Sequence, residues 1–336
     1  MGEAVLRPVV RRTHPTMPPI MTEGNRIAAL DLGSLTVRLA IAEVAGPGRF
    51  RQILHWRDIT ALGQGLALTG ALDEGGMARS GAAIREFMQV MAEYGVARFK
   101  AVGTQALRQA SNRQVFLDRL QRELQLDVEV LAPEDEARLS LNGVLSALAS
   151  EYAAAPALTV IDVGGGSSEF ALLRNGQPPR FHSLPLGVLI LSQAFPLGDP
   201  PEPERLAALR QHLSHQLSTF HQRAIRPFFA APPLLVGAAG SVTTLAAMAL
   251  RLVPYDADKI NNYRLTRAQV ADLAGLVAGL TEARRARLPG LEPAKAGVMV
   301  AGAFLILAIM EVFQADSLVV IDAGLLEGVL AGLTTK

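Results

Sequence analysis

The sequence of 336 residues contains no cysteine, which excludes disulfides, thiolate metal sites and a cysteine nucleophile. It also lacks an excess of either charge, because 32 basic and 31 acidic residues leave a formal net charge of +1. A protein that coats nucleic acid is usually strongly basic, so we expect no nucleic-acid partner. Any polyanion would have to bind in a local basic groove. The six histidines show no spacing typical of a metal site.

Long apolar runs are missing as well. The longest, Val298 to Met310, holds about 13 residues, whereas a helix needs about 20 to cross a bilayer. We therefore predict a buried helix there and no membrane partner. Residues 1–25 contain several arginines and prolines but no apolar stretch of signal-peptide length. We expect these residues to form a flexible N-terminal tail and the protein to be cytoplasmic.

What the sequence has in abundance is apolar surface for folding, since 50% of its residues are hydrophobic and only 19% are charged. A chain of this length suits about two domains. Strands are expected at 26–32, 37–44, 50–60, 99–103, 127–131, 157–163, 168–173, 180–188, 234–236 and 317–321. Helices are expected at 74–94, from a cap at Asn112 to 125, from Pro133, and at 203–222, 266–280, 292–313 and 323–333. A turn at 237–241 is expected to lead into a further helix that ends at about 251.

This order of strands and helices occurs twice, which predicts an α/β protein of two domains with mixed sheets. We place the first lobe at 26–134 and assign to it the C-terminal helix at 323–336. The second lobe is expected at 135–322. The acidic, proline-led helix start at 133–136 is the predicted hinge between them.

Two similar segments organise the predicted chemistry. An apolar strand ends in Asp31-Leu32-Gly33-Ser34, and a second ends in Asp162-Val163-Gly164-Gly165-Gly166-Ser167-Ser168-Glu169. Glycines allow a sharp turn whose N–H groups approach an anion closely. Acids beside such a turn suit a divalent cation, since carboxylate oxygens are its usual ligands. One glycine-rich turn is most often structural, but two with the same pattern predict domains that face one phosphate.

Two further side chains are candidates for the reaction. Glu134, Asp135 and Glu136 stabilise a helix N-terminus in any case, through the helix dipole. Helical spacing places Glu136 on the face of Ser140, so Glu136 is the candidate base. Arg108 follows a predicted buried strand, where it either caps the next turn or binds a phosphate with its planar guanidinium.

Motifs in a fixed order carry a family resemblance. They are Asp31-Leu32-Gly33-Ser34, Thr104-Gln105-Ala106-Leu107-Arg108, Glu136-Ala137-Arg138-Leu139, Asp162 to Glu169, Leu184-Pro185-Leu186-Gly187 and Gly237 to Ala246. Over residues 26–333 the chain resembles the exopolyphosphatase / guanosine pentaphosphate phosphatase (Ppx/GppA) family, in its short two-domain form. The resemblance implies the actin/sugar-kinase/Hsp70-like (ribonuclease H-like) fold, with two lobes and a cleft between them.

The same resemblance implies a role in the stringent response and hydrolysis of a terminal phosphoanhydride, in inorganic polyphosphate or pppGpp, with Mg²⁺ or alternatively Mn²⁺. Glu136 would be the general base, Glu169 would position the water and Arg108 would neutralise the transferred phosphate. Asp31, Asp162 and Glu169 would hold the metal, and a homodimer is expected. The implied substrate-binding residues are Gly33, Ser34, Leu35, Thr104, Gly164, Gly165, Gly166, Ser167, Ser168, Gly240 and Ser241.

The chain also departs from the family pattern. Leu35 stands where the first loop usually has Asn, and Lys295 replaces an Arg of a late helix. Ala323 and Leu326 replace two more arginines. These changes leave a second hypothesis open, a polyphosphate or (p)ppGpp sensor that has lost turnover. A third is an ATPase or sugar kinase of the same fold. The choice between polyphosphate and pppGpp stays open too.

Overall fold

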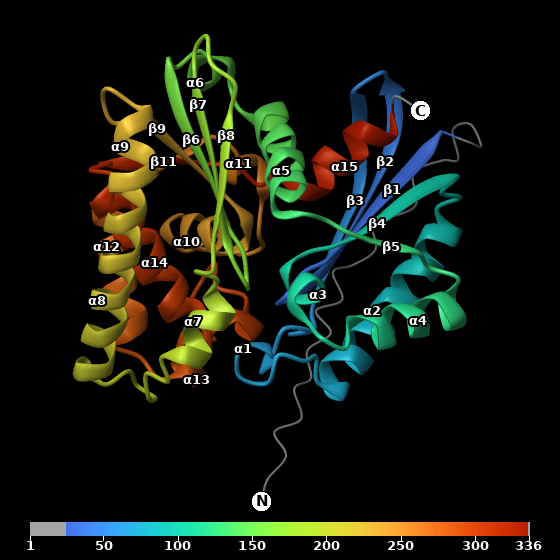
Figure 1. Cartoon of the computed structure of the whole chain (residues 1–336), viewed down its shortest axis with the longest axis horizontal. Helices are drawn as coiled ribbons and strands as arrows, with labels where there is room; N and C mark the ends of the chain where they lie inside the picture. Colours follow the sequence, from blue (N-terminus) through green and yellow to red (C-terminus); the bar gives the residue numbers. More distant parts are fainter. Residues whose placement is uncertain (1–24, 335–336) are drawn as a thin grey trace, which may run out of the picture.

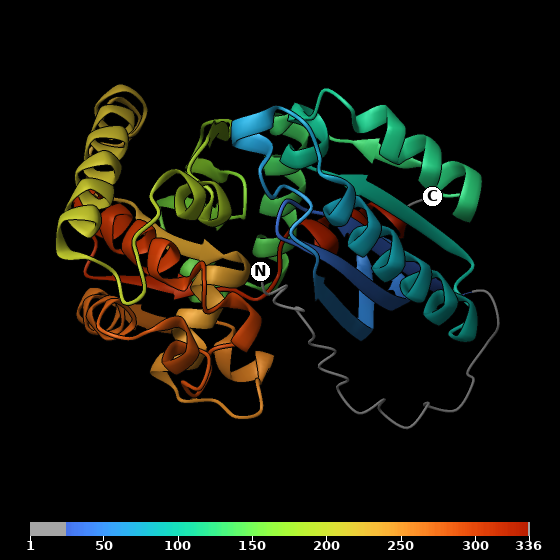
Figure 2. The same cartoon turned by 90° about the horizontal axis from the view of Figure 1, so that it is seen from below.

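The computed structural model describes residues 25–334, which form two α/β lobes side by side (Figures 1 and 2). The predicted tail at 1–25 lies almost entirely outside the described residues. The first sheet has the order β3-β2-β1-β4-β5, in which β1 is antiparallel to β2 and parallel to β4. Its strands are β1 (Arg26–Leu32), β2 (Thr36–Gly46), β3 (Arg49–Ile59), β4 (Arg98–Gly103) and β5 (Val128–Val130).

The second sheet repeats this arrangement. Its order is β10-β11-β9-β6-β7-β8, so β8-β7-β6-β9-β11 corresponds to the whole first sheet and β10 is an additional edge strand. Again the central strand, β6, is antiparallel to one neighbour and parallel to the other. The strands are β6 (Ala157–Val163), β7 (Ser168–Arg174), β8 (Arg180–Leu184), β9 (Leu234–Ala238), β10 (Tyr263–Thr266) and β11 (Ser317–Val320).

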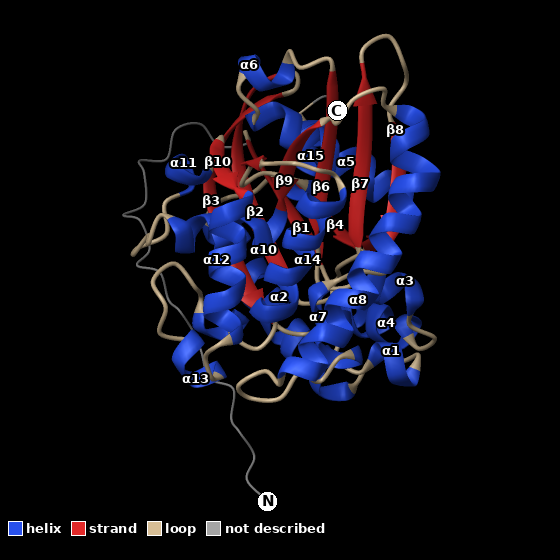
Figure 3. Cartoon of the chain, turned by 90° about the vertical axis from the view of Figure 1, so that its left-hand side faces the viewer, coloured by secondary structure: helices blue, strands red, loops and turns tan. Residues whose placement is uncertain are grey.

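Helices cover the outer face of each sheet. On the first, α2 (Glu74–Glu93) and α4 (Arg113–Leu124) bury Phe87 and Phe116 against Leu30 and Leu39. Asp73 caps α2 by accepting a hydrogen bond from the Gly76 N–H at 3.0 Å. On the second sheet the covering helices stand in front of the strands in Figure 3. They are α7 (Val188–Ala194), α8 (Pro203–Phe220), α10 (Ala239–Ala249), α12 (Arg267–Ala278) and α14 (Met299–Val312).

Two helices fill the space between the sheets (Figure 1). α15 (Leu325–Leu333) packs on the inner face of the first sheet, and α5 (Pro133–Ala147) packs on that of the second. They touch where a Cβ on Gly143 would lie 1.9 Å from the Gly324 carbonyl oxygen, and one on Gly328 would lie 2.0 Å from that of Leu139. Glycine at both positions therefore lets the two helices cross in close contact.

The structure corrects several element boundaries. The strand expected at 180–188 ends at Leu184, and the segment continues into α7. The helix expected at 292–313 is a short 3₁₀ turn, Pro293–Lys295, followed by α14. Asn112 precedes α4, but its side chain bonds the backbone of Leu72 in both directions, at 2.8 and 2.9 Å, instead of capping the helix.

The remaining elements are short. They are α1 (Leu66–Thr69), α3 (Gln105–Gln109), α6 (Ser150–Ala153), a π-turn at His221–Ile225, α9 (Arg226–Phe228), α11 (Ala257–Ile260) and α13 (Glu282–Arg285). Within residues 25–334, no helix has both the length and the apolarity needed to span a membrane. The buried helix predicted from the longest apolar run is α14, whose residues Met299 to Met310 are all buried.

Candidate functional site

Two hairpins of the same design face each other across the cleft. In the first, Asp31 at the end of β1 is paired in register with Arg38 on β2. In the second, Asp162 on β6 is paired with Glu169 on β7. The turns match as well, because the Gly33 N–H donates to the Thr36 carbonyl at 3.0 Å and the Gly164 N–H to the Ser167 carbonyl at 2.9 Å.

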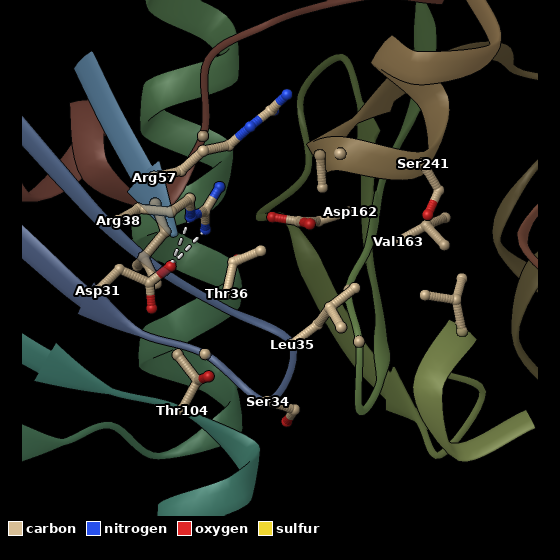
Figure 4. A pocket seen from close by; sticks show the side chains of 18 of the residues that line it. Asp31, Ser34, Leu35, Thr36, Arg38, Arg57, Thr104, Asp162, Val163 and Ser241 are labelled. Atoms are coloured by element: carbon tan, nitrogen blue, oxygen red, sulfur yellow. Dashed lines mark hydrogen bonds and ion pairs between the residues drawn. The ribbon is translucent and has the colours of Figure 1, made fainter. Parts of the chain in front are cut away.

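The two turns are packed directly against each other. A Cβ on Gly165 would lie 2.8 Å from the Cβ of Leu35, whose side chain reaches from the first hairpin toward the second in Figure 4. A Cβ on Gly166 would lie 2.4 Å from Gln105 Oε1 and 2.5 Å from Ser34 Oγ. Glycine at these two positions is thus required for the close approach of the two lobes. The sequence had indicated only that these glycines let the backbone approach a phosphate.

A cavity opens beside this contact, and both lobes line it (Figure 4). Most of the predicted site residues are brought together there. Those that line the cavity are Asp31, Gly33, Ser34, Leu35, Thr104, Glu136, Asp162, Gly164, Gly165, Gly166, Ser167, Glu169, Gly240 and Ser241.

Ser168 does not belong to this lining. Its hydroxyl is buried and donates to the Leu186 carbonyl oxygen at 2.7 Å. The reason is the alternation of side chains along β7, which turns Glu169 to the cavity and Ser168 to the opposite face. The expectation that Ser168 is a substrate-binding residue is therefore corrected.

Arg108 is also placed differently from the prediction. Its Nη1 donates to Glu136 Oε2 at 2.6 Å and to the Leu131 carbonyl oxygen at 2.9 Å, and the residue does not line the cavity. Here the guanidinium contacts the presumed base. In this arrangement Arg108 acts on the site through Glu136.

Glu136 and Ser140 lie on the same buried face of α5, as helical spacing predicted, while Glu134 is exposed. Ser140 Oγ donates to Asp162 Oδ2 at 2.5 Å. A helix that lies between the lobes therefore carries both the candidate base and the hydroxyl that orients an acid of the second lobe.

The acids of the cavity perturb one another. Burial raises the pKa of Glu136 to about 7, against the opposing effect of Arg108. Burial, with the charges of Glu136 and Asp162, raises the pKa of Glu169 to about 8. Burial also raises the pKa of Asp31, although Arg38 donates to its Oδ2 at 2.5 and 2.8 Å. Crowded, desolvated carboxylates of this kind are typical of a functional site.

The same acids fit magnesium by ligand chemistry, since Mg²⁺ prefers oxygen ligands. Asp31 Oδ1 is buried and has no hydrogen-bond partner, so it retains an unused acceptor. Across the part of the chain that the structure describes, no three His, Asp or Glu side chains converge closely enough to hold a metal. Mg²⁺ commonly takes only one or two carboxylates and completes its shell with water and phosphate oxygens, so the acids still suit it.

The model of the Ppx/GppA phosphatase family matches residues 40–336. The chain belongs to this family. It is 31% identical over 326 residues to a protein of Mycobacterium tuberculosis named exopolyphosphatase 2, with 92% of this chain and 98% of that protein covered. The resemblance on which the sequence interpretation relied is therefore confirmed.

Solved structures support the same assignment. A Ppx/GppA family member from Aquifex aeolicus superposes with a TM-score of 0.73 at 33% identity, covering 92% of this chain and 97% of that one. An exopolyphosphatase from Cytophaga hutchinsonii gives a TM-score of 0.83 at 26% identity, with the same shares covered. The predicted fold class, two α/β lobes with mixed sheets, is confirmed.

Three basic side chains of this Ppx/GppA chain also line the cavity and were not among the predicted site residues: Arg38, Arg57 and Lys295. Arg57 on β3 pairs with Glu292 of the second lobe at 2.7 Å. The buried Lys295 approaches Glu292 at 3.6 Å and donates to Thr244 Oγ1 at 3.2 Å. Sequence had offered one signal for Arg38, because it follows Asp31 at the interval at which Glu169 follows Asp162.

Proposed function

We propose that the chain is a metal-assisted phosphohydrolase that releases the terminal orthophosphate of inorganic polyphosphate, pppGpp or both. The observation that carries the proposal is Glu136. This buried carboxylate has a pKa near 7 and lines one cavity together with the glycine turns of both lobes. A base whose pKa lies near the working pH is well matched to take a proton from water.

In the proposed reaction, the terminal phosphate lies in the cavity, beside the backbone turns at Gly33 and Gly164. A water oxygen forms a bond to the terminal phosphorus, and one water proton passes to the Glu136 carboxylate. The bond between that phosphorus and the bridging oxygen breaks, and its electron pair stays on the shortened chain. Phosphoryl transfer of this kind depends mainly on positioning and on stabilisation of charge.

The chain's own side chains prepare this step. Arg108 holds the Glu136 carboxylate, and Ser140 holds that of Asp162. Charge on the phosphate oxygens would be neutralised by Mg²⁺, or alternatively Mn²⁺, held by Asp162 and Glu169, with Asp31 facing them from the other lobe. Without a cation, the negative charges of these three acids would repel the phosphate and weaken its binding, since like charges repel at short range.

The test is phosphate release from polyphosphate and from pppGpp, measured side by side with Mg²⁺ and with EDTA. We expect release only with the metal, and Glu136→Gln should lower kcat by about 10²–10⁴-fold, the usual contribution of a general base. Glu134→Gln is the matched control, because Glu134 is exposed two residues earlier on α5. If phosphate were released from neither substrate, the proposal would be contradicted. A fully active Glu136→Gln variant would exclude Glu136 as the base.

Leu35 favours a second candidate, a sensor that binds polyphosphate or (p)ppGpp without turnover. Its apolar side chain occupies the first turn and contacts Gly165 of the other lobe. Leucine has no polar side-chain group, so this position supplies no hydrogen-bond donor to a bound phosphate. Tight binding of pppGpp with no phosphate released over hours would favour the sensor, whereas ready turnover would exclude it.

A further inference from the structure

Gln105 has a buried polar group that nothing in the protein satisfies. The residue is 6% exposed, begins α3 directly after Thr104, and lines the cavity. Its Oε1 is buried and has no hydrogen-bond partner. Buried polar atoms are nearly always paired, so an unpaired amide oxygen on a residue that lines a cavity indicates a missing donor.

The amide lies at the contact between the two lobes. Its Oε1 and the Ser34 hydroxyl flank the same face of Gly166, 2.4 and 2.5 Å from the point that a Cβ would occupy. Three residues further along α3, Arg108 donates to Glu136 at 2.6 Å. Residues three apart share a helix face. One short helix therefore places Gln105 at the phosphate turns and fixes the candidate base.

The chemistry of the cavity restricts what the missing donor is. The neighbouring acids Asp31, Glu136 and Asp162 accept hydrogen bonds when ionised, and so do phosphate oxygens. None of these groups can satisfy an amide oxygen, and the donors that line the same cavity, such as the Ser34 hydroxyl, do not bond it. Water can, because it donates two hydrogen bonds.

We propose that Gln105 orients the attacking water: Gln105 Oε1 accepts one O–H of the water while Glu136 accepts the other. With both hydrogens directed to the protein, a lone pair of the water oxygen is left to face the terminal phosphorus. The proton on the Glu136 side moves to that carboxylate as the bond to phosphorus forms, and the other hydrogen stays on the released orthophosphate. This assignment rests on the hydrolysis proposed above.

Gln105→Met tests the assignment, since it removes the amide and keeps the length of the side chain. We expect kcat and kcat/KM to fall together by about 100-fold, as for a misplaced reactant whose binding is unchanged. The thermal unfolding midpoint should stay the same or rise, because an apolar group replaces an unpaired buried amide. Gln109→Met, on the same helix but exposed, is the control and should match the unaltered chain in both measurements.

Three results would overturn the assignment. One is a kcat for Gln105→Met equal to that of Gln109→Met. The second is a raised KM at unchanged kcat, which would make Gln105 a phosphate ligand. The third is a lowered unfolding midpoint with nearly full kcat, which would make it structural. Gln105→Leu repeats the test if the methionine variant does not fold. An unaltered chain that releases no phosphate would overturn the hydrolysis and this role together, whereas an active chain with an active Gln105→Met overturns this role alone.

Discussion

The two hairpins of the cleft have the same backbone design but differ in charge. Each has an Asp at the end of a central strand, a turn closed by a Gly N–H, and a register partner for that Asp on the next strand. The partner is Arg38 in the first lobe and Glu169 in the second. One half of a repeated structure thus neutralises its own acid, and the other half adds a second acid.

This difference assigns separate tasks to the two halves. Asp31 is held by Arg38, whereas Asp162 and Glu169 accept hydrogen bonds from the neutral hydroxyls of Ser140 and Ser183. Among the described residues neither Asp162 nor Glu169 forms an ion pair. The second hairpin therefore carries buried negative charge that a bound cation would balance. Burial, with the charges of Glu136 and Asp162, raises the pKa of Glu169.

The largest effect is expected from replacing Arg38, the basic partner of Asp31 in the first hairpin. Arg38→Gln leaves the Asp31 carboxylate buried without its counter-charge, and loss of one partner of a buried pair costs about 3–5 kcal/mol. We expect the free energy of unfolding, from urea denaturation at pH 7.5, to fall by that amount. Arg51→Gln is the control, since Arg51 is 66% exposed in its pair with Glu43 and such pairs contribute about 1 kcal/mol or less. Equal losses for the two variants would show that Asp31 does not depend on Arg38.

The buried acids Glu136, on α5, and Glu169, in the second hairpin, should make the free energy of unfolding depend on pH, with a smaller effect than the loss of Arg38. The pKa values of Glu136 and Glu169 are raised from 4.5 to about 7 and about 8, so the folded chain binds protons that the unfolded chain releases. Without metal, stability should therefore be greatest below about pH 4.5 for these groups and should fall as the pH rises through 7 and 8.

The measurement is urea denaturation in EDTA at pH 5.5 and pH 8. The unaltered chain should be less stable at pH 8, and Glu169→Gln should reduce this difference because it removes one of the two titrating groups. A chain that becomes more stable between these pH values, with the variant behaving identically, would contradict the assigned charge balance.

Much of the fold was predictable because its signals are local. The alternation and apolar runs around Asp31 and Asp162 located the central strand of each sheet, and the proline-led acidic segment located α5. Spacing on that helix also selected Glu136 over Glu134. The predicted capping by Asn112 failed because of a non-local contact, since its amide is taken by the distant backbone of Leu72.

The site was predictable in its residue types but not in its pairings. Arg108 was expected on phosphate because sequence cannot show that Glu136, on another helix, lies within reach of it. The ion pair between Arg57 and Glu292 joins the two lobes. The two residues are far apart in the sequence, and no local sequence pattern predicts that they pair. Arg38 is different, since superimposing the two repeats in sequence would have placed it opposite Asp31.

The most direct test of the central claim, that the acids of the second hairpin bind a cation, is calorimetric titration of Mg²⁺ at pH 8. Imidodiphosphate, a phosphate ligand that resists hydrolysis, would be present to complete the metal's shell. We expect saturable Mg²⁺ binding to the unaltered chain, weakened about tenfold or more in Glu169→Gln, because an oxygen ligand is lost. Equal Mg²⁺ affinity in the two proteins, or no binding to the unaltered chain, would contradict this claim.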